Sequence, residues 1–158
     1  MEPERDTNGA GRAGWLPMLH PTLVAMAIAL FGASLVFDLV AQRADNQFVY
    51  SQGSFVLVGL GLAVGVIGVV FLVAEIAGLG PGGRRRQGRI HLAVLDGALL
   101  WFVLTELKRR STSLAPQPLW ISAVSAVVVL VLLVSHVLDL RQVEAAPGDP
   151  ARASSSAR

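Results

Sequence analysis

Four long stretches of apolar sequence limit what this chain can fold into. A helix needs about 20 apolar residues to cross the hydrocarbon core of a bilayer. The stretches that reach or approach this length lie near residues 21–42, 53–76, 89–108 and 118–138. Together they take up about half of the 158 residues, which leaves too little polar sequence to coat four buried helices in water. The sequence therefore predicts a membrane domain.

The apolar residues in these stretches are continuous, whereas the strands of a membrane barrel alternate between apolar and polar residues. Because lipid forces every backbone polar group to pair within its own segment, a continuous apolar stretch must be a helix. We expect an all-α protein, an integral membrane antiparallel four-helix bundle over residues 20–140. A polar N-terminal tail over residues 1–19 and a disordered C-terminal tail over residues 141–158 are expected to flank it.

Composition removes several classes of function. The chain has no cysteine, which excludes disulfides, thiolate metal sites and cysteine nucleophiles. It has no phosphate-binding loop, and Gly59 and Gly61 lie inside an apolar helix, where they cannot form a dinucleotide-binding turn. A net charge of +2 in a bilayer protein gives no reason to expect nucleic acid. We expect the lipid bilayer as the main partner and no catalytic activity.

Basic residues are unequally shared between the two sides of the predicted bundle. Nine of the 13 Lys and Arg residues fall in the two tails or between the second and third stretches, and four fall on the other side. Loops with excess Lys and Arg remain in the cytoplasm. The sequence predicts a multi-pass protein of the bacterial inner membrane with both termini in the cytoplasm.

Polar residues converge at one end of the predicted bundle. In an antiparallel bundle the start of the first helix, the end of the second, the start of the third and the end of the fourth share one membrane face. Those positions hold His20, Glu75, His91, His136 and Asp139. Neutral imidazole binds both haem and divalent metals, so these five residues are candidate cofactor ligands. The alternative is that histidines simply end helices at the headgroups, with no cofactor bound.

Carboxylates inside the apolar stretches also need an explanation. A charged Asp96, almost two turns into the third helix, costs about 2.5 to 3.5 kcal/mol on the insertion scale. We expect it to be a buried polar residue that faces the bundle interior, is hydrogen-bonded or is protonated. Towards the opposite end, Asp38 and Glu106 are expected to form interfacial ion pairs with Arg43 and with residues 108–110.

Small residues mark one face of the second helix. Gly61, Gly65 and Gly68 share a stripe at 100° per residue. Small residues let helix backbones approach closely in lipid. We therefore expect this stripe to be a helix-packing face, either within the chain or in a homo-oligomer through Gly61 and Gly65.

Several short segments carry a family resemblance. The segment 19–24 opens the first helix, 36–40 ends it, a glycine-rich and arginine-rich loop follows the second helix, and 88–91 opens the third. Over about residues 19–138 the chain resembles the family of predicted bacterial membrane proteins called domain of unknown function 2231. The resemblance implies four membrane helices without an assigned activity. Because some members carry or neighbour a Rieske-type iron–sulfur domain, it also implies a redox partner.

The chain departs from the family pattern at two places. The usual family opening is His-Pro-x-x-Val-His-Phe-Pro; His20 and Pro21 match its first pair, but Ala25 and Ala27 replace the second histidine and the second proline. The family's glycine-rich ending of the fourth helix is also missing. If family members bind a cofactor through the second histidine, this chain lacks that ligand.

Three functional interpretations follow from these observations. The first is a small structural or accessory membrane subunit without catalytic activity and without a cofactor. The second is a redox membrane protein that binds haem or a divalent metal through His20, His91 and His136. The third is a proton or small-solute pathway that uses Asp96.

Overall fold

The computed structural model describes residues 16–78, 83–112 and 116–144 of the chain, and these residues form four α-helices and no strand. The helices are α1 (Leu16–Ala41), α2 (Gln47–Gly78), α3 (Gly83–Ser111) and α4 (Leu119–Glu144). Each helix is long and apolar enough to cross a membrane. The predicted all-α four-helix bundle of membrane type is therefore confirmed.

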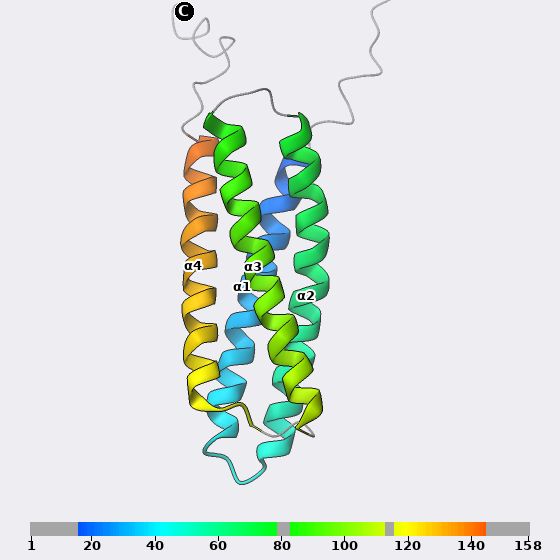
Figure 1. Cartoon of the computed structure of the whole chain (residues 1–158), viewed down its shortest axis with the longest axis vertical. Helices are drawn as coiled ribbons and strands as arrows, with labels where there is room; N and C mark the ends of the chain where they lie inside the picture. The colour runs from blue at the N-terminus through cyan, green and yellow to red at the C-terminus, as the bar shows by residue number, and fades with distance from the viewer. Residues whose placement is uncertain (1–15, 79–82, 113–115, 145–158) are drawn as a thin grey trace, which may run out of the picture.

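The helices form a long bundle in which each helix packs against two others. Helix α1 lies beside α2 and α4, and α3 lies beside the same two helices. Figure 1 shows that consecutive helices run in opposite directions, because the colour gradient runs down α1, up α2, down α3 and up α4. The start of α1, the end of α2, the start of α3 and the end of α4 thus share one end of the bundle.

The helices extend beyond the apolar stretches. Helix α1 begins at Leu16 rather than near residue 21, and α2 begins at Gln47 rather than near residue 53. Helix α3 begins at Gly83 rather than near residue 89, and α4 continues to Glu144 rather than ending near residue 138. Apolar length marks the part of a helix that lies in lipid, while backbone hydrogen bonds continue into polar sequence. The remaining parts of both predicted tails, residues 1–15 and 145–158, lie outside the described residues.

The outer surface of the bundle is apolar on every helix. Large hydrophobic side chains such as Val70, Leu100 and Val127 are about as exposed as a surface charge would be in a soluble protein, at 62%, 60% and 59%. Soluble monomers rarely expose large contiguous apolar surfaces. Lipid is the medium in which such a surface is stable.

The centre of the bundle is built around two stacked aromatic rings. Phe31 of α1 and Phe102 of α3 lie with ring centroids 4.0 Å apart and planes inclined by 6°. Both rings are buried, and Leu95, Leu132 and Val24 pack in the same core. The stack lets α1 and α3 meet through side chains, although their backbones are not neighbours.

Glycines on α2 let the bundle close tightly on one side. Gly61 lies under the ring of Phe31, where an added Cβ would be 2.6 Å from Phe31 Cε1. Gly65 lies in the same way under Leu99 of α3, and Gly68 faces Val24 of α1. The glycine stripe therefore packs within the chain, as one of the two alternatives expected. The other alternative, a homo-oligomer through Gly61 and Gly65, stays a prediction, and Phe31 and Leu99 of the same chain lie against these two glycines.

Candidate functional site

The three histidines of the chain meet inside one end of the bundle, here called the histidine end. His20 comes from α1, His91 from α3 and His136 from α4. The ring centroids of His20 and His91 are 5.5 Å apart, and those of His91 and His136 are 5.9 Å apart. All three side chains are buried. The structure thus brings together three polar residues that are far apart in sequence.

Two carboxylates complete the histidine cluster, which we define as His20, Glu75, His91, His136 and Asp139. Glu75 at the end of α2 places Oε2 3.6 Å from Nδ1 of His20. Asp139 of α4 forms a closer group with two histidines, because one donor atom from each of His20, His91 and Asp139 lies within 4.8 Å of the others. All four helices therefore supply a residue to this site.

The ring nitrogens of the cluster differ in whether they have a hydrogen-bond partner. His91 Nδ1 shares a hydrogen bond of 2.8 Å with the hydroxyl of Ser135. Nε2 of His20, Nε2 of His91 and Nδ1 of His136 are buried without a hydrogen-bond partner. A buried polar atom without a partner is costly, and native structures contain few of them. These nitrogens are consequently available as ligand atoms.

Ser135 was not singled out from the sequence. It lies directly before His136 and reaches the site because α4 turns it toward His91. A serine next to a candidate ligand on a predicted spanning helix is the only sequence signal that points to it. Its hydrogen bond to His91 could not be predicted from the sequence, because it depends on how α3 and α4 are rotated relative to each other.

The geometry of the cluster fits a single metal ion better than haem. Imidazole nitrogen and carboxylate oxygen bind zinc at about 2.0 to 2.2 Å in a tetrahedron, so donors 4.8 Å apart must approach one another by about 1.4 Å to share one ion. A haem needs a flat space between two axial rings. Here the rings of His20 and His91 meet edge to face, with Asp139 and His136 beside them. These side chains occupy the space that a haem between His20 and His91 would need.

Asp96 does not belong to this site. It is exposed on the outer surface of α3, and the expectation that it faces the bundle interior is wrong. Five residues separate it from His91, which places the two side chains about 140° apart on the helix. Because His91 is fully buried, Asp96 must point away from the core. An internal pathway through Asp96 therefore loses its basis.

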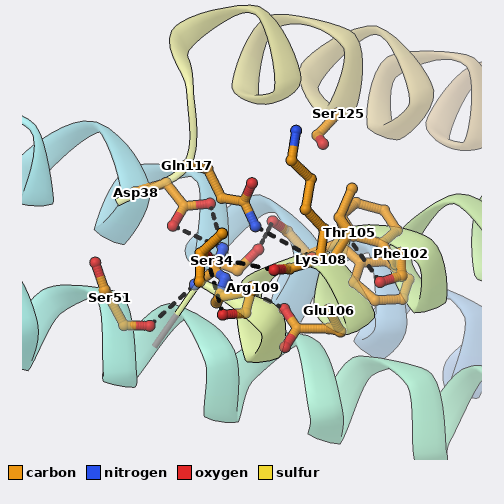
Figure 2. Close-up of polar contacts among 12 residues, drawn as sticks. Ser34, Asp38, Ser51, Phe102, Thr105, Glu106, Lys108, Arg109, Gln117 and Ser125 are labelled. Atoms are coloured by element: carbon orange, nitrogen blue, oxygen red, sulfur yellow. Dashed lines mark hydrogen bonds and ion pairs between the residues drawn. The ribbon is translucent and has the colours of Figure 1, made fainter. Parts of the chain in front are cut away.

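A second polar cluster occupies the opposite end of the bundle, here called the Arg109 end. Arg109 of α3 donates Nη2 to both carboxylate oxygens of Asp38 in α1, each at 2.9 Å. Its Nη1 donates to the backbone oxygen of Ser51 in α2, also at 2.9 Å. Figure 2 shows these bonds converging on Arg109 from both helices. A single guanidinium thus links three helices.

The remaining charges of this end differ from the sequence expectation of interfacial pairs. Glu106 lies one turn before Arg109 with Oε1 3.7 Å from its Nε, and both residues are buried within the bundle. Lys108 and Arg110 instead lie over the rings of Trp120 and Phe55, at 5.0 and 5.2 Å from the centroids. The expected ion pairs of Asp38 and Glu106 with a residue of 108–110 are confirmed, both through Arg109, but they lie inside the bundle and not at the interface, because Arg109 continues the inward-facing stripe of α3.

Arg43, the other expected partner of Asp38 and Glu106, is exposed.

The Arg109 end has an additional polar connection that the sequence did not indicate. Gln117, just before α4, donates Nε2 to the backbone oxygen of Thr105 at 3.2 Å. Gln42 donates in turn to the backbone oxygen of Gln117 at 3.4 Å. These bonds attach the connection between α3 and α4 to the bundle.

Comparison with known proteins places the chain in a family. The model of a family described as "Predicted membrane protein (DUF2231)" matches residues 17–140, which cover nearly all of the four helices. No curated protein matches the sequence, and no solved structure does.

Proposed function

The chain belongs to the predicted membrane proteins of domain family 2231, and we propose that it is an accessory membrane subunit that binds one divalent transition-metal ion in the histidine cluster. The observation that carries this proposal is the convergence of His20, His91 and Asp139 from three helices, with donor atoms within 4.8 Å of one another. The bilayer-spanning bundle is the scaffold that holds them.

The donor set supports a transition metal over calcium or magnesium. Imidazole suits zinc, copper, iron and nickel, whereas calcium and magnesium prefer oxygen ligands alone. Two residues contact the other nitrogen of these imidazole rings: Glu75 lies next to Nδ1 of His20, and Ser135 is bonded to Nδ1 of His91. This leaves Nε2 of each ring to face a metal. Histidine ligands in metalloproteins are commonly oriented by a carboxylate or another polar group on the second nitrogen.

A closed site supports an accessory role over an enzymatic one. Catalytic zinc sites keep a coordination position open for water or substrate, whereas structural sites fill all four. His136 lies beside His91, outside the group of donors within 4.8 Å of one another, and its buried nitrogen without a hydrogen-bond partner would supply the fourth protein ligand. A metal held by four side chains from three helices would stabilise the bundle without reacting with a substrate.

We also propose that the histidine end faces the cytoplasm of a bacterium, with both termini on that side of the inner membrane. The start of α3 supports this orientation, because Arg86 and Arg89 are exposed there beside the partly buried Arg85. Positive charges flanking spanning helices favour the cytoplasmic side. The metal would then be taken from the cytoplasm.

Titration with Co²⁺ tests the proposed metal site. Four-coordinate cobalt bound by nitrogen and oxygen absorbs visible light, so binding and geometry are read in one spectrum. The purified chain in detergent, stripped with a chelator, is expected to bind one Co²⁺ that an excess of Zn²⁺ displaces. His91→Ala and Asp139→Asn are expected to lose this binding. Asp96→Asn is the matched control, since it changes an aspartate of a spanning helix that lies outside the cluster.

Two results would contradict the proposal. The first is a wild-type protein that does not bind Co²⁺ or Zn²⁺ saturably, and the second is an Asp139→Asn variant that binds as the wild type does. Either result would favour the structural subunit without a cofactor that was the first interpretation of the sequence. A Soret band in the purified wild-type protein that is lost in His91→Ala would instead favour haem.

A further inference from the structure

Asp96 is an exposed carboxylate near the middle of a membrane-spanning helix. The candidate span of α3 runs from Arg85 to Ser111, and Asp96 lies eleven residues after its start and fifteen before its end. Its side chain is exposed on the outer face of the bundle. Since a helix rises 1.5 Å per residue, neither end of the span is within reach of an aspartate side chain. The apolar part of α3 begins near residue 89, so the carboxylate faces the apolar layer about two turns from its boundary at the histidine end.

The surface around Asp96 is otherwise apolar and has small residues next to the carboxylate. Ala93 and Leu100 lie on the same side of α3, one turn away in either direction, and both are exposed. Gly97 has open space around it, because an added Cβ would meet nothing within 4 Å. Small residues beside a polar one allow another helix to approach closely and to bond to the polar group. Charged residues that face lipid directly are rare in spanning helices.

We propose that this surface of α3, defined by Ala93, Asp96, Gly97 and Leu100, docks a transmembrane helix of a different membrane protein that carries a Lys or Arg at the depth of Asp96. Charge complementarity selects this occupant. The cation of the partner neutralises the carboxylate, and the apolar residues around both exclude water and lipid headgroups from the pair. This surface does not involve the histidine cluster, so the inference stands apart from the proposed metal site.

A second copy of this chain fits the surface poorly. Two copies with the same orientation in the membrane are related by an axis along the membrane normal, so residues of equal depth meet. Such a dimer would bring Asp96 against Asp96. Arg89, seven residues earlier and about 20° away on the helix, would likewise meet Arg89. Like charges placed opposite each other disfavour that pairing.

Energy transfer in lipid vesicles tests the docking surface with defined probes. The full chain, labelled with a donor fluorophore, is mixed with a Leu/Ala model transmembrane helix that carries an acceptor and one Lys at the depth of Asp96. A second model helix has Leu at that position. We expect the Lys helix to bind the wild-type chain at least tenfold more tightly than the Leu helix does. Asp96→Leu is expected to remove this preference, and Val70→Ala, which changes an exposed residue of α2 outside this surface, is expected to keep it.

Three results would overturn the inference. One is equal binding of both model helices by the wild-type chain, and another is a preference for the Lys helix that persists in Asp96→Leu. The third is self-association of the wild-type chain that Asp96→Leu abolishes, which would assign the surface to a second copy. Because Asp96 is exposed on the outer face of the bundle, Asp96→Leu is expected to keep the unfolding temperature and the Co²⁺ binding of the wild type, which separates this test from that of the metal site.

Discussion

Arg109 in α3 and Asp38 in α1 form an ion pair inside the bundle, with one guanidinium nitrogen 2.9 Å from each carboxylate oxygen. The two residues are only 2% and 5% exposed. Removing one partner of a buried pair leaves an uncompensated charge and costs about 3 to 5 kcal/mol. We expect Arg109→Met to lower the free energy of unfolding by that amount, measured by titration with SDS in mixed micelles.

The double variant Asp38→Leu with Arg109→Met is the control for this ion pair. Replacing both charges by apolar side chains leaves no charge unpaired, so most of the lost stability is expected to return. Lys108→Met, which changes an exposed cation one residue away, is expected to have an effect below about 1 kcal/mol. An Arg109→Met protein as stable as the wild type would show that the pair contributes nothing.

Gly61 is expected to tolerate no side chain. A Cβ at this position would lie 2.6 Å from Phe31 Cε1, and the ring cannot move away because it is stacked on Phe102. Overpacking of a core typically costs about 1 to 3 kcal/mol. Gly61→Ala should be destabilised by this amount in the same SDS titration. Gly59→Ala is the matched control, since a Cβ there would meet nothing within 4 Å, and equal effects of the two substitutions would contradict the packing described.

Ser135 is expected to tune the metal affinity without being a ligand. It is bonded to Nδ1 of His91, and loss of such an orienting partner usually weakens metal binding by about 10 to 100-fold. Ser135→Ala should therefore still bind one Co²⁺, with a dissociation constant raised by that factor. Ser122→Ala is the control, because it removes a buried serine hydroxyl of the same helix outside the cluster. Unchanged affinity in Ser135→Ala would assign the serine a purely structural role.

The absence of cysteine makes the orientation of the chain directly measurable. Single cysteines introduced at Asp45, after α1, and at Arg86, near the start of α3, are expected to be at opposite membrane surfaces. A maleimide that does not cross the membrane should label Asp45→Cys in intact bacterial cells and Arg86→Cys only after the cells are opened. The reverse pattern would invert the proposed orientation, and labelling of both in intact cells would contradict the four crossings.

The sequence was sufficient to predict which residues share a depth in the membrane. Four spans that alternate in direction fix the level of every residue along the bundle axis. For this reason His20, His91 and His136 were expected at one end before any side chain was placed. Depth depends only on counting residues along helices of constant rise.

The sequence was not sufficient to predict how each helix is rotated about its own axis. The 140° between His91 and Asp96 showed that only one of them can face the core, but not which one. Arg109 is likewise one of three consecutive basic residues. It faces inward because it lies on the same face of α3 as Phe102. Rotation is decided by the packing of whole helix faces, such as Phe31 on Gly61, which no single helix contains.

The stacked phenylalanines lie between the two polar ends of the bundle. Phe31 follows His20 by eleven residues and Phe102 follows His91 by eleven, while Asp38 and Arg109 each come seven residues after their phenylalanine. The stack therefore lies about 16 Å from the imidazoles and about 10 Å from the guanidinium. The stacked rings separate the two polar ends of the bundle with apolar side chains. Perturbations at opposite ends should accordingly combine additively, as those of two separate molecules would.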